Sequence, residues 1–439
     1  MTLKPPPDET PVPSVVGRTR RIEPEEYAAV VAAAIQADVF GPDDDAVLFY
    51  DLDRLGDRIA ELQDAFPAQT LHALAVKANP SIGLLRKAAA AGMGAEVASA
   101  GELALAEAAA IDLALTVFDS PAKTEREIEA ALRRPLLLNA NSGAELQRIA
   151  ACSTGPRARV GLRVNPTIGA GTIGRTSTAT RRSKFGVPIS AVRSVVAEYC
   201  RQGGRLDAPH VHVGSQGMSL EQLVAACGSV YRLFTELRET IPSLKILDIG
   251  GGLPVAYRDG HAAPSHAEYA AALRRTIPEL WSSDLSLITE FGRSMHANNG
   301  WVASRIEYAL DDDAQGGTLI THVGADLFVR TAYQPGVWQH EVLVLTGDGQ
   351  LRTGDTSPFN VAGPLCFSGD YLGRDVPLPV SVMPGDHLVV GHAGGYTVAM
   401  WSTYDSRQIP KSMCYIDVPS FALLAERESL ATIVSRWKA

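Results

Sequence analysis

A lysine at the end of an apolar run is the residue of this sequence with the clearest capacity for chemistry. Lys77 closes Leu71–Lys77, a run with the length and composition of a buried strand, and Asn79-Pro80 breaks the backbone pattern directly after it. Burial disfavours the ammonium and so lowers the pKa of such a lysine. A neutral amine can form an imine with an aldehyde such as pyridoxal phosphate. The alternative is a lysine whose charged end simply extends into solvent.

Three consecutive glycines follow a second apolar run. Gly250, Gly251 and Gly252 come directly after Asp248-Ile249. Without side chains, their backbone N–H groups can turn inward around an anion. The spacing is neither that of a dinucleotide fingerprint nor that of a Walker loop. The segment therefore predicts a phosphate site, and a tight turn is the alternative.

A carboxylate and an imidazole also close strand-like runs. Glu290 is followed three residues later by Arg293, and His212 lies in Val211–Gln216. A carboxylate in a dry site needs a cationic partner, which is either a protonated pyridine nitrogen or Arg293 itself. The imidazole of His212 could stack on an aromatic cofactor or serve as an ordinary structural histidine.

Two further candidates lie toward the C-terminus. Cys366 lies in the turn-rich segment Gly363–Asp370, and a buried inert thiol is the alternative to a reactive one. Tyr396 follows Gly394-Gly395, so its phenol lies beside flexible backbone, either for function or for packing.

The elements that must position these residues alternate between helix and strand. We expect a helix over 25–39, a strand over 46–50, and helices near 53–65, 81–91, 101–110, 124–133, 143–152, 189–203, 219–240 and 266–280. Between the later helices, eight short apolar strands are predicted at 71–77, 93–97, 115–119, 135–139, 158–164, 210–214, 245–250 and 286–290. This pattern predicts a parallel (β/α)8 barrel, although an open doubly wound sheet gives the same local signals.

Polar or glycine residues end nearly every predicted strand at its carboxyl side. In a barrel these ends meet on the face where barrel enzymes hold their active sites. Lys77, His212, Gly250 and Glu290 would therefore lie close together, although they are far apart in the sequence.

The rest of the chain has a different pattern. Strand-like runs at 306–310, 318–323, 340–345, 359–365, 388–391 and 413–418 indicate a mostly antiparallel β domain. The predicted domains are an N-terminal segment over 1–44, in which residues 1–20 form a mobile tail and the helix packs with the β domain, the barrel over 45–297, and the C-terminal β domain over 298–439.

Composition narrows the classes of function. The net charge of −9 is spread along the chain and argues against nucleic-acid binding. Five scattered cysteines show neither metal-ligand spacing nor disulfide pairing, as expected in a reducing compartment. Neither a signal pattern nor a run of membrane-spanning length is present, so a cytoplasmic protein without metal or membrane contacts is expected.

Taken in order, these motifs resemble those of the fold-type III pyridoxal-phosphate decarboxylases, the family of diaminopimelate decarboxylase and eukaryotic-type ornithine decarboxylase. The resemblance covers roughly residues 45–420. It rests on Ala75–Asn79, Glu96–Leu103, Ser183–Gly186, His212–Gln216, Gly250–Gly252, Glu290 with Gly292-Arg293, and Gly363–Cys366.

The resemblance implies a role for each motif. Lys77 would hold the cofactor as an imine, His212 would stack on its ring, and Glu290 would keep the ring nitrogen protonated. The cofactor phosphate would be bound by Ser215, Gly250, Gly251, Gly252, Gly292, Arg293 and Tyr396. Cys366 would reprotonate the reacting carbon in the other subunit, which implies a homodimer with shared active sites.

Departures from the family pattern lie where the far end of the substrate would be. The family usually carries an acidic residue after the cysteine, to pair with a distal amine, and this chain has Phe367. The family's Arg-Pro segment reads Arg330-Thr331-Ala332-Tyr333. We therefore name Arg330, Tyr333, Phe367 and Asp370 as candidate substrate contacts. The long loop 166–182 either closes over the substrate or is a surface insertion.

The leading hypothesis is a pyridoxal-phosphate-dependent α-decarboxylase for a non-standard amino acid of specialised metabolism, conjugated as in siderophore pathways or linked to a carrier protein. The first alternative is a diaminopimelate, lysine, ornithine or arginine decarboxylase. An amino-acid racemase would need a second base facing Lys77, such as a tyrosine. A non-catalytic regulatory relative is the third alternative, and the retention of Lys77, His212, Glu290 and Cys366 argues against it.

Overall fold

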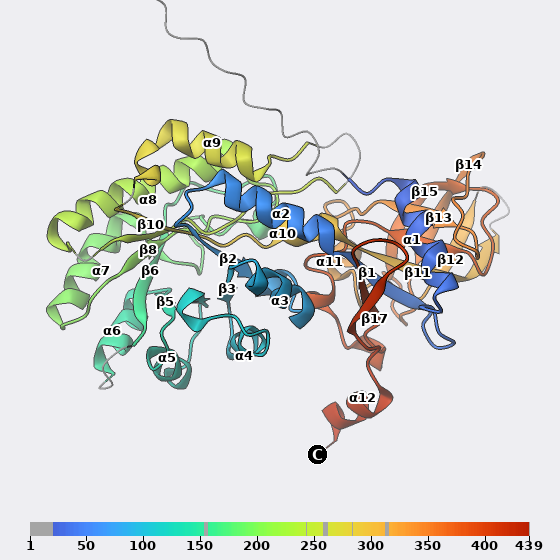
Figure 1. Cartoon of the computed structure of the whole chain (residues 1–439), viewed down its shortest axis with the longest axis horizontal. Coiled ribbons are helices and arrows are strands. Elements are labelled where there is room, and N and C mark those ends of the chain that lie inside the picture. The colour runs from blue at the N-terminus through green and yellow to red at the C-terminus, as the bar shows by residue number, and fades with distance from the viewer. Residues whose placement is uncertain are drawn as a thin grey trace, which may run out of the picture.

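Two sheets of different kinds organise the chain (Figure 1). The computed structural model describes residues 21–152, 157–242, 244–257, 262–282, 284–311 and 316–438. The predicted tail over 1–20 lies outside the described residues. Among the described residues, no helix is both long and apolar enough to cross a membrane.

The first sheet closes into the predicted barrel. Its eight strands are all parallel and pair in the order β5-β4-β3-β2-β10-β9-β8-β6, and β5 and β6 pair with each other to complete the ring. The pairing between β5 and β6 excludes the open doubly wound sheet. The strands are β2 (Leu71–Ala75), β3 (Gly94–Val97), β4 (Thr116–Asp119), β5 (Leu137–Ala140), β6 (Arg159–Asn165), β8 (Ala208–His210), β9 (Ile246–Asp248) and β10 (Ser286–Thr289), and the two-residue β7 (Val187–Pro188) adds to β6.

Helices cover the outside of this barrel (Figure 1). Several begin within a few residues of a strand end. The start of the helix is fixed by a hydroxyl side chain that accepts a hydrogen bond from a free N–H group of the first turn. Ser99, for example, accepts a hydrogen bond from the N–H of Glu102 at 3.1 Å. The helices are α2 (Leu52–Ala65), α3 (Ile82–Ala90), α4 (Ala100–Ala108), α5 (Glu125–Leu132), α6 (Gly143–Ala151), α7 (Ile189–Arg201), α8 (Leu220–Thr240) and α9 (His266–Thr276).

The second sheet is mostly antiparallel and belongs mainly to the C-terminal part of the chain. Its main path runs β15-β14-β12-β11-β1-β17-β18, and β16 joins β13 to β11. The strands are β1 (Ala46–Asp51), β11 (Gly300–Asp311), β12 (Gly317–Thr321), β13 (Val342–Leu345), β14 (Thr356–Ala362), β15 (Tyr371–Pro379), β16 (His387–Val390), β17 (Lys411–Tyr415) and β18 (Phe421–Ala425).

Strand β1 lies in this second sheet, whereas the sequence analysis begins the barrel at residue 45. It pairs antiparallel with β11 and parallel with β17. The packing of Phe49 explains why β1 lies in this sheet, because its ring stacks on that of Trp301 in β11 with ring centroids 4.5 Å apart. A barrel strand would have no such partner, so the barrel proper begins at β2.

Helix α1 (Pro24–Gln36) packs on the same face of the second sheet. Tyr27 meets the edge of Trp301 with ring centroids 5.1 Å apart, and both side chains are fully buried. The segment before the barrel thereby shares a hydrophobic core with the C-terminal strands. The domain boundaries at 44/45 and 297/298 stay predictions.

Some elements were not predicted. They are α10 (Arg293–His296), α11 (Val329–Tyr333), β15, β18 and α12 (Leu430–Trp437). Helices of four or five residues are too short to show a periodic pattern. Strand β15 carries Pro377 and Pro379, and prolines are tolerated there because β15 is an edge strand.

The packing around Trp301 predicts a large effect on stability. We expect Trp301→Ala to lower the free energy of unfolding by about 3–5 kcal/mol, because it removes the central ring of this cluster. Trp437→Ala is the matched control, since that side chain is 68% exposed, and it should change stability by less than about 0.5 kcal/mol. Chemical denaturation measures both, and equal effects would contradict the assigned core.

Candidate active site

Lys77 lies directly after β2, in the middle of a short 3-10 segment over Val76–Ala78. Its Nζ contacts Oε2 of Glu96, which closes β3 and is fully buried. Burial lowers the pKa of Lys77, but the charges of Glu96, Tyr396 and Glu290, together with the hydrogen bond to Glu96, outweigh burial and raise this pKa above its usual value. The predicted lowering of this pKa is therefore wrong for the chain alone. The side chain of Lys77 is 37% exposed, so a ligand can reach it.

Glu96 is the partner that this reversal depends on. Burial raises its pKa to about 7, although the neighbouring Lys77 lowers it. Its second oxygen, Oε1, has no hydrogen-bond partner among the described residues. Lys77 and Glu96 thus form an ion pair in which one carboxylate oxygen of Glu96 has no hydrogen-bond partner among the described residues.

Glu290 follows β10 and is held in its charged form. Its Oε2 lies 3.2 Å from Nε2 of His210, the last residue of β8. Although burial raises the pKa of Glu290, the charge of His210 lowers it to about 2. Burial lowers the pKa of His210, and the charges of Glu290, Asp248 and Asp119 raise it to about 9.

The remaining oxygen of Glu290 is available to a ligand. Oε1 is buried and has no hydrogen-bond partner in the described part of the chain. An ionised, orphaned carboxylate oxygen at a barrel end fits a cationic N–H group such as a protonated pyridine nitrogen. Asp248 lies beside this pair, with polar side-chain atoms of Asp248, His210 and Glu290 all within 4.8 Å of one another. Burial and the charge of Glu290 raise the pKa of Asp248.

His212 presents a neutral ring at the same end of the barrel. Its Nδ1 accepts a hydrogen bond from the N–H of Gly251 at 3.2 Å. Burial and the charges of Arg163 and Lys77 lower its pKa to about 3. A neutral imidazole can stack on an aromatic ring without adding charge to the site.

The glycine segment brings this histidine close to Glu290. A side chain on Gly251 would place its Cβ 2.2 Å from the carbonyl oxygen of Glu290. Gly250 has φ +62°, and its Cβ would lie 2.4 Å from the carbonyl oxygen of Val211. These glycines therefore allow neighbouring strand ends to approach, in addition to exposing the N–H groups that the sequence analysis assigns to an anion.

Arg293 begins α10 and is surrounded by polar and aromatic groups. Nε donates to Oγ of Ser215 at 2.9 Å, and Nη1 donates to the hydroxyl of Tyr257 at 2.5 Å. Its guanidinium lies 4.4 Å from the ring centre of Tyr396 and 4.9 Å from that of Trp338. Within the described ranges, no carboxylate pairs with it.

Arg330, on α11, shares two of these rings. Its guanidinium lies 4.5 Å from the ring centre of Tyr396 and 4.9 Å from that of Trp338. Burial and the charge of Arg293 lower the pKa of Arg330 to about 10. Two guanidinium groups that lack carboxylate partners in the described structure form an anion site, and a phosphate fits it.

Tyr396 connects this anion site to the lysine. Its backbone has φ +58°, and its N–H donates to the carbonyl oxygen of Ala78 at 2.7 Å. Gly292 packs on the same turn, where an added Cβ would lie 2.9 Å from the Cβ atoms of Ala75 and Ala78. The structure therefore brings together the predicted residues Lys77, His212, Ser215, Gly250, Gly251, Gly252, Glu290, Gly292, Arg293, Arg330 and Tyr396.

Of the remaining predicted residues, Cys366, Phe367 and Asp370 lie on the loop between β14 and β15, and Tyr333 ends helix α11. Cys366 is exposed, and its N–H donates to Oδ2 of Asp405 at 2.7 Å. Phe367 stacks on Tyr333 with ring centroids 5.5 Å apart. In the described part of the chain, the hydrogen bonds of this loop include none to Lys77, His212 or Glu290.

Asp370 has a structural role that the sequence analysis did not predict. Its Oδ1 accepts a hydrogen bond from the N–H of Ala325 at 2.5 Å, and its Oδ2 accepts one from the N–H of Leu365 at 2.7 Å. Only 3% of the residue is exposed. Asp370 therefore folds the Cys366 loop instead of offering a free carboxylate to a substrate.

Sequence reasoning did not give a role to several groups that complete the site. Arg163 Nη1 donates to Oδ2 of Asp119 at 2.6 Å, and this buried pair lies near His210. Glu96, Asp119 and Arg163 were recognised as polar residues at strand ends, without a role, whereas His210 and Asp248 were not singled out. All five lie at or next to the carboxyl ends of barrel strands, and that position is the signal that identifies them. Tyr257 and Trp338 lie on loops, where no pattern points to them.

The long loop 166–182 is folded against the strand end that carries His212. Oγ1 of Thr178 donates to the carbonyl oxygen of His212 at 2.6 Å, and Oγ1 of Thr176 donates to that of Gln216 at 2.5 Å. Ile173 packs against the cluster that contains Tyr257 and Trp338. The loop is thus part of the wall of the site, which favours the first of its two interpretations.

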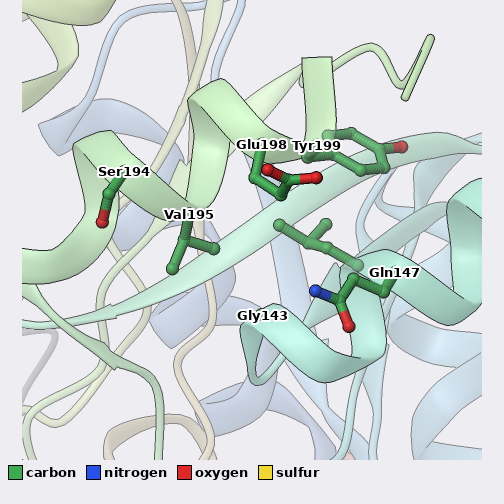
Figure 2. A pocket seen from close by; sticks show the side chains of 7 residues that line it. Gly143, Gln147, Ser194, Val195, Glu198 and Tyr199 are labelled. Atoms are coloured by element: carbon green, nitrogen blue, oxygen red, sulfur yellow. The ribbon is translucent and has the colours of Figure 1, made fainter. Parts of the chain in front are cut away.

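A pocket of about 170 Å³ lies elsewhere, between the outer helices α6 and α7. Figure 2 shows side chains of the two helices, Gln147 on one side and Val195 and Glu198 on the other. None of the predicted site residues lines it, and we assign it no role.

Comparisons with known proteins agree with this geometry. The family model "Pyridoxal-dependent decarboxylase, pyridoxal binding domain" matches residues 52–297. A diaminopimelate decarboxylase of Vibrio cholerae is 32% identical over 365 residues, 82% of this chain and 84% of that protein. The enzyme of the same name from Pseudomonas aeruginosa is 34% identical over 341 residues, 76% and 78% of the two chains. The crystal structure of diaminopimelate decarboxylase from Helicobacter pylori complexed with L-lysine has a TM-score of 0.83 and 28% identity, and the match covers 92% of this chain and 99% of that chain.

The pair of His210 and Glu290 predicts a pH-dependent stability. Because the pKa of His210 is raised from 6.5 to about 9, its contribution is complete below pH 6.5 and is lost as the pH rises through about 9. Because the pKa of Glu290 is lowered to about 2, its contribution to the free energy of unfolding is lost only as the pH falls through about 2 and Glu290 becomes protonated. We expect the loss of unfolding free energy in His210→Gln to be larger near neutral pH than above pH 9. A loss that is constant across this range, measured by chemical denaturation, would contradict the pairing.

Proposed function

Since the chain belongs to the family of pyridoxal-dependent decarboxylases, we propose that diaminopimelate is its substrate. Its reaction is the decarboxylation of an amino acid, and its cofactor is pyridoxal phosphate. The observation that carries the proposed substrate is the similarity to diaminopimelate decarboxylases over three quarters or more of both chains. The leading hypothesis of the sequence analysis, a conjugated amino acid, has no comparable support, and the diaminopimelate alternative takes its place.

The charges of the site support this substrate. Diaminopimelate carries a second carboxylate, and Arg330 is a half-buried guanidinium without a carboxylate partner among the described residues. The side chain lies beside Arg293 and stacks on the ring of Tyr396, so it is held in place before a ligand arrives. Arg293 would bind the cofactor phosphate with Ser215 and Gly250–Gly252, and Arg330 would bind a carboxylate of the substrate.

The residues of the barrel fit the cofactor's other groups. Bound pyridoxal phosphate supplies an electron sink for the bonding electrons that the departing carboxylate leaves behind. Lys77 Nζ would attach the cofactor, and His212 would pack its neutral ring against it. Glu290 Oε1 would accept a hydrogen bond from the ring nitrogen and keep a proton there, because its own pKa is lowered.

Cys366 would supply the proton that replaces the lost carboxylate. Its loop is exposed in a single chain and makes no hydrogen bond to Lys77 within the described residues. We therefore propose a homodimer in which Cys366 of one subunit completes the site around Lys77 of the other. Both the barrel and the β domain would then contribute to each active site.

A panel of amino acids tests the proposed substrate. We expect cofactor-loaded protein to release carbon dioxide from meso-diaminopimelate with a kcat/KM at least about tenfold above that for lysine, ornithine or arginine, because those substrates leave Arg330 without a carboxylate. Release only from citrate-conjugated diamino acids would instead support the conjugated substrate, and release only from basic amino acids would exclude diaminopimelate.

Mixing two inactive variants tests the shared site. Lys77→Ala and Cys366→Ala should each have little activity. Subunit exchange at equal concentrations makes half of the dimers mixed, and each mixed dimer holds one site with both residues intact, so about a quarter of the wild-type activity should return. If the mixture is no more active than its separate components, Cys366 does not act across subunits.

A further inference from the structure

Asp405 lies beside Cys366, although neither the fold nor the proposed reaction requires a carboxylate there. Its Oδ2 accepts the N–H of Cys366 at 2.7 Å, and the hydroxyl of the neighbouring Tyr404 donates to the carbonyl oxygen of Cys366 at 3.3 Å. Its backbone has φ +57°, a left-handed conformation that aspartate and asparagine tolerate better than most residues. The carboxylate is thus fixed to the loop that carries the thiol.

The second oxygen of this carboxylate is available. In the described structure, Oδ1 of Asp405 has neither a hydrogen bond nor an ion pair, and the residue is exposed. Asp370 also accepts a hydrogen bond from the Cys366 loop, but its two oxygens are used by the N–H groups of Leu365 and Ala325. Phe367 is apolar and stacks on Tyr333. Of the two carboxylates that accept hydrogen bonds from this loop, Asp405 is the one with a free oxygen in the described structure.

Diaminopimelate creates a need for such a group. The molecule carries a second ammonium at the end remote from the carbon that loses its carboxylate. An ammonium that is removed from water without a carboxylate partner is strongly disfavoured. The guanidiniums of Arg293 and Arg330, which lack carboxylate partners among the described residues, would repel it.

We propose that Asp405 binds the distal ammonium of the substrate and so selects a diamino acid. This assignment rests on the proposed function, in which Cys366 reaches the reacting carbon in the other subunit. Because Asp405 accepts a hydrogen bond from the backbone N–H of Cys366, its carboxylate would lie in the same active site of the other subunit as the thiol. The phenyl ring of Phe367, stacked on Tyr333, would pack along the apolar methylene chain between the two ends of the substrate.

Two substrates that differ in one group test this assignment. 2-Aminopimelate has the chain and both carboxylates of diaminopimelate but lacks the distal amine. We expect Asp405→Asn to lower kcat/KM for meso-diaminopimelate at least about tenfold and to change kcat/KM for 2-aminopimelate by less than about twofold. Asparagine keeps an oxygen for the N–H of Cys366 and tolerates the left-handed backbone, so the loop itself is preserved.

Asp375→Asn is the matched control. Asp375 is exposed and has a φ of +52°, but it lies on β15 and makes no hydrogen bond with the Cys366 loop among the described residues. It should leave both substrates unaffected. Calorimetry with the holoenzyme gives an independent readout. Asp405→Asn should weaken the binding of the product L-lysine, whose α-ammonium is the distal ammonium of the substrate, and leave the binding of 6-aminohexanoate, which lacks that ammonium, unchanged.

The outcomes separate this assignment from the proposed function. If wild-type enzyme decarboxylates meso-diaminopimelate and Asp405→Asn is unimpaired, the role of Asp405 is wrong and the substrate stands. Equal losses for both substrates would show a structural role and overturn the assignment as well. If wild-type enzyme does not decarboxylate diaminopimelate, the proposed function fails and the assignment fails with it.

Discussion

Buried charges at the carboxyl end of the barrel must neutralise one another, because water is excluded there and each uncompensated charge is strongly unfavourable. Three cations, Lys77, Arg163 and His210, face three carboxylates, Glu96, Asp119 and Glu290. Burial and the charge of Glu290 raise the pKa of Asp248, so a further negative charge is avoided. This balance keeps Glu290 ionised and His210 protonated, and it gives the barrel end its fixed electrostatic character.

The anion site has the opposite arrangement. Arg293 and Arg330 stack on aromatic rings instead of pairing with carboxylates. Aromatic faces hold a guanidinium in position while they leave its charge available to a ligand. One end of the site is therefore internally neutral and suits the cofactor's ring, whereas the other end has excess positive charge and suits phosphate and carboxylate groups. The proposed role of Asp405 adds the negative charge that a second ammonium would need, and it does so from the exposed loop of Cys366.

Much of this could be predicted from sequence because a parallel barrel converts strand order into spatial proximity. Lys77, His212 and Glu290 each follow the end of an apolar strand within about two residues, so closure of the barrel was enough to bring them together. The pKa of Lys77 was not predictable, since it depends on Glu96 from the neighbouring strand, and a local pattern does not show which side chains meet. Strand β1 was recognised, but its sheet was not, because an apolar run does not identify its pairing partner. Asp370 is buried and accepts hydrogen bonds at both carboxylate oxygens, whereas Asp405 is exposed and accepts one at Oδ2. These differences are properties of the folded chain and leave no sign in a local sequence pattern.

The central claim is that Lys77, paired with Glu96 at the carboxyl end of the barrel, is the residue that carries the cofactor. Reduction of the cofactor-loaded protein with borohydride, followed by digestion and peptide mass spectrometry, tests this directly. The account predicts one pyridoxyl modification, on the peptide that contains Lys77, and its absence in Lys77→Ala. A modification on another lysine, or none on the peptide of Lys77, would contradict the account.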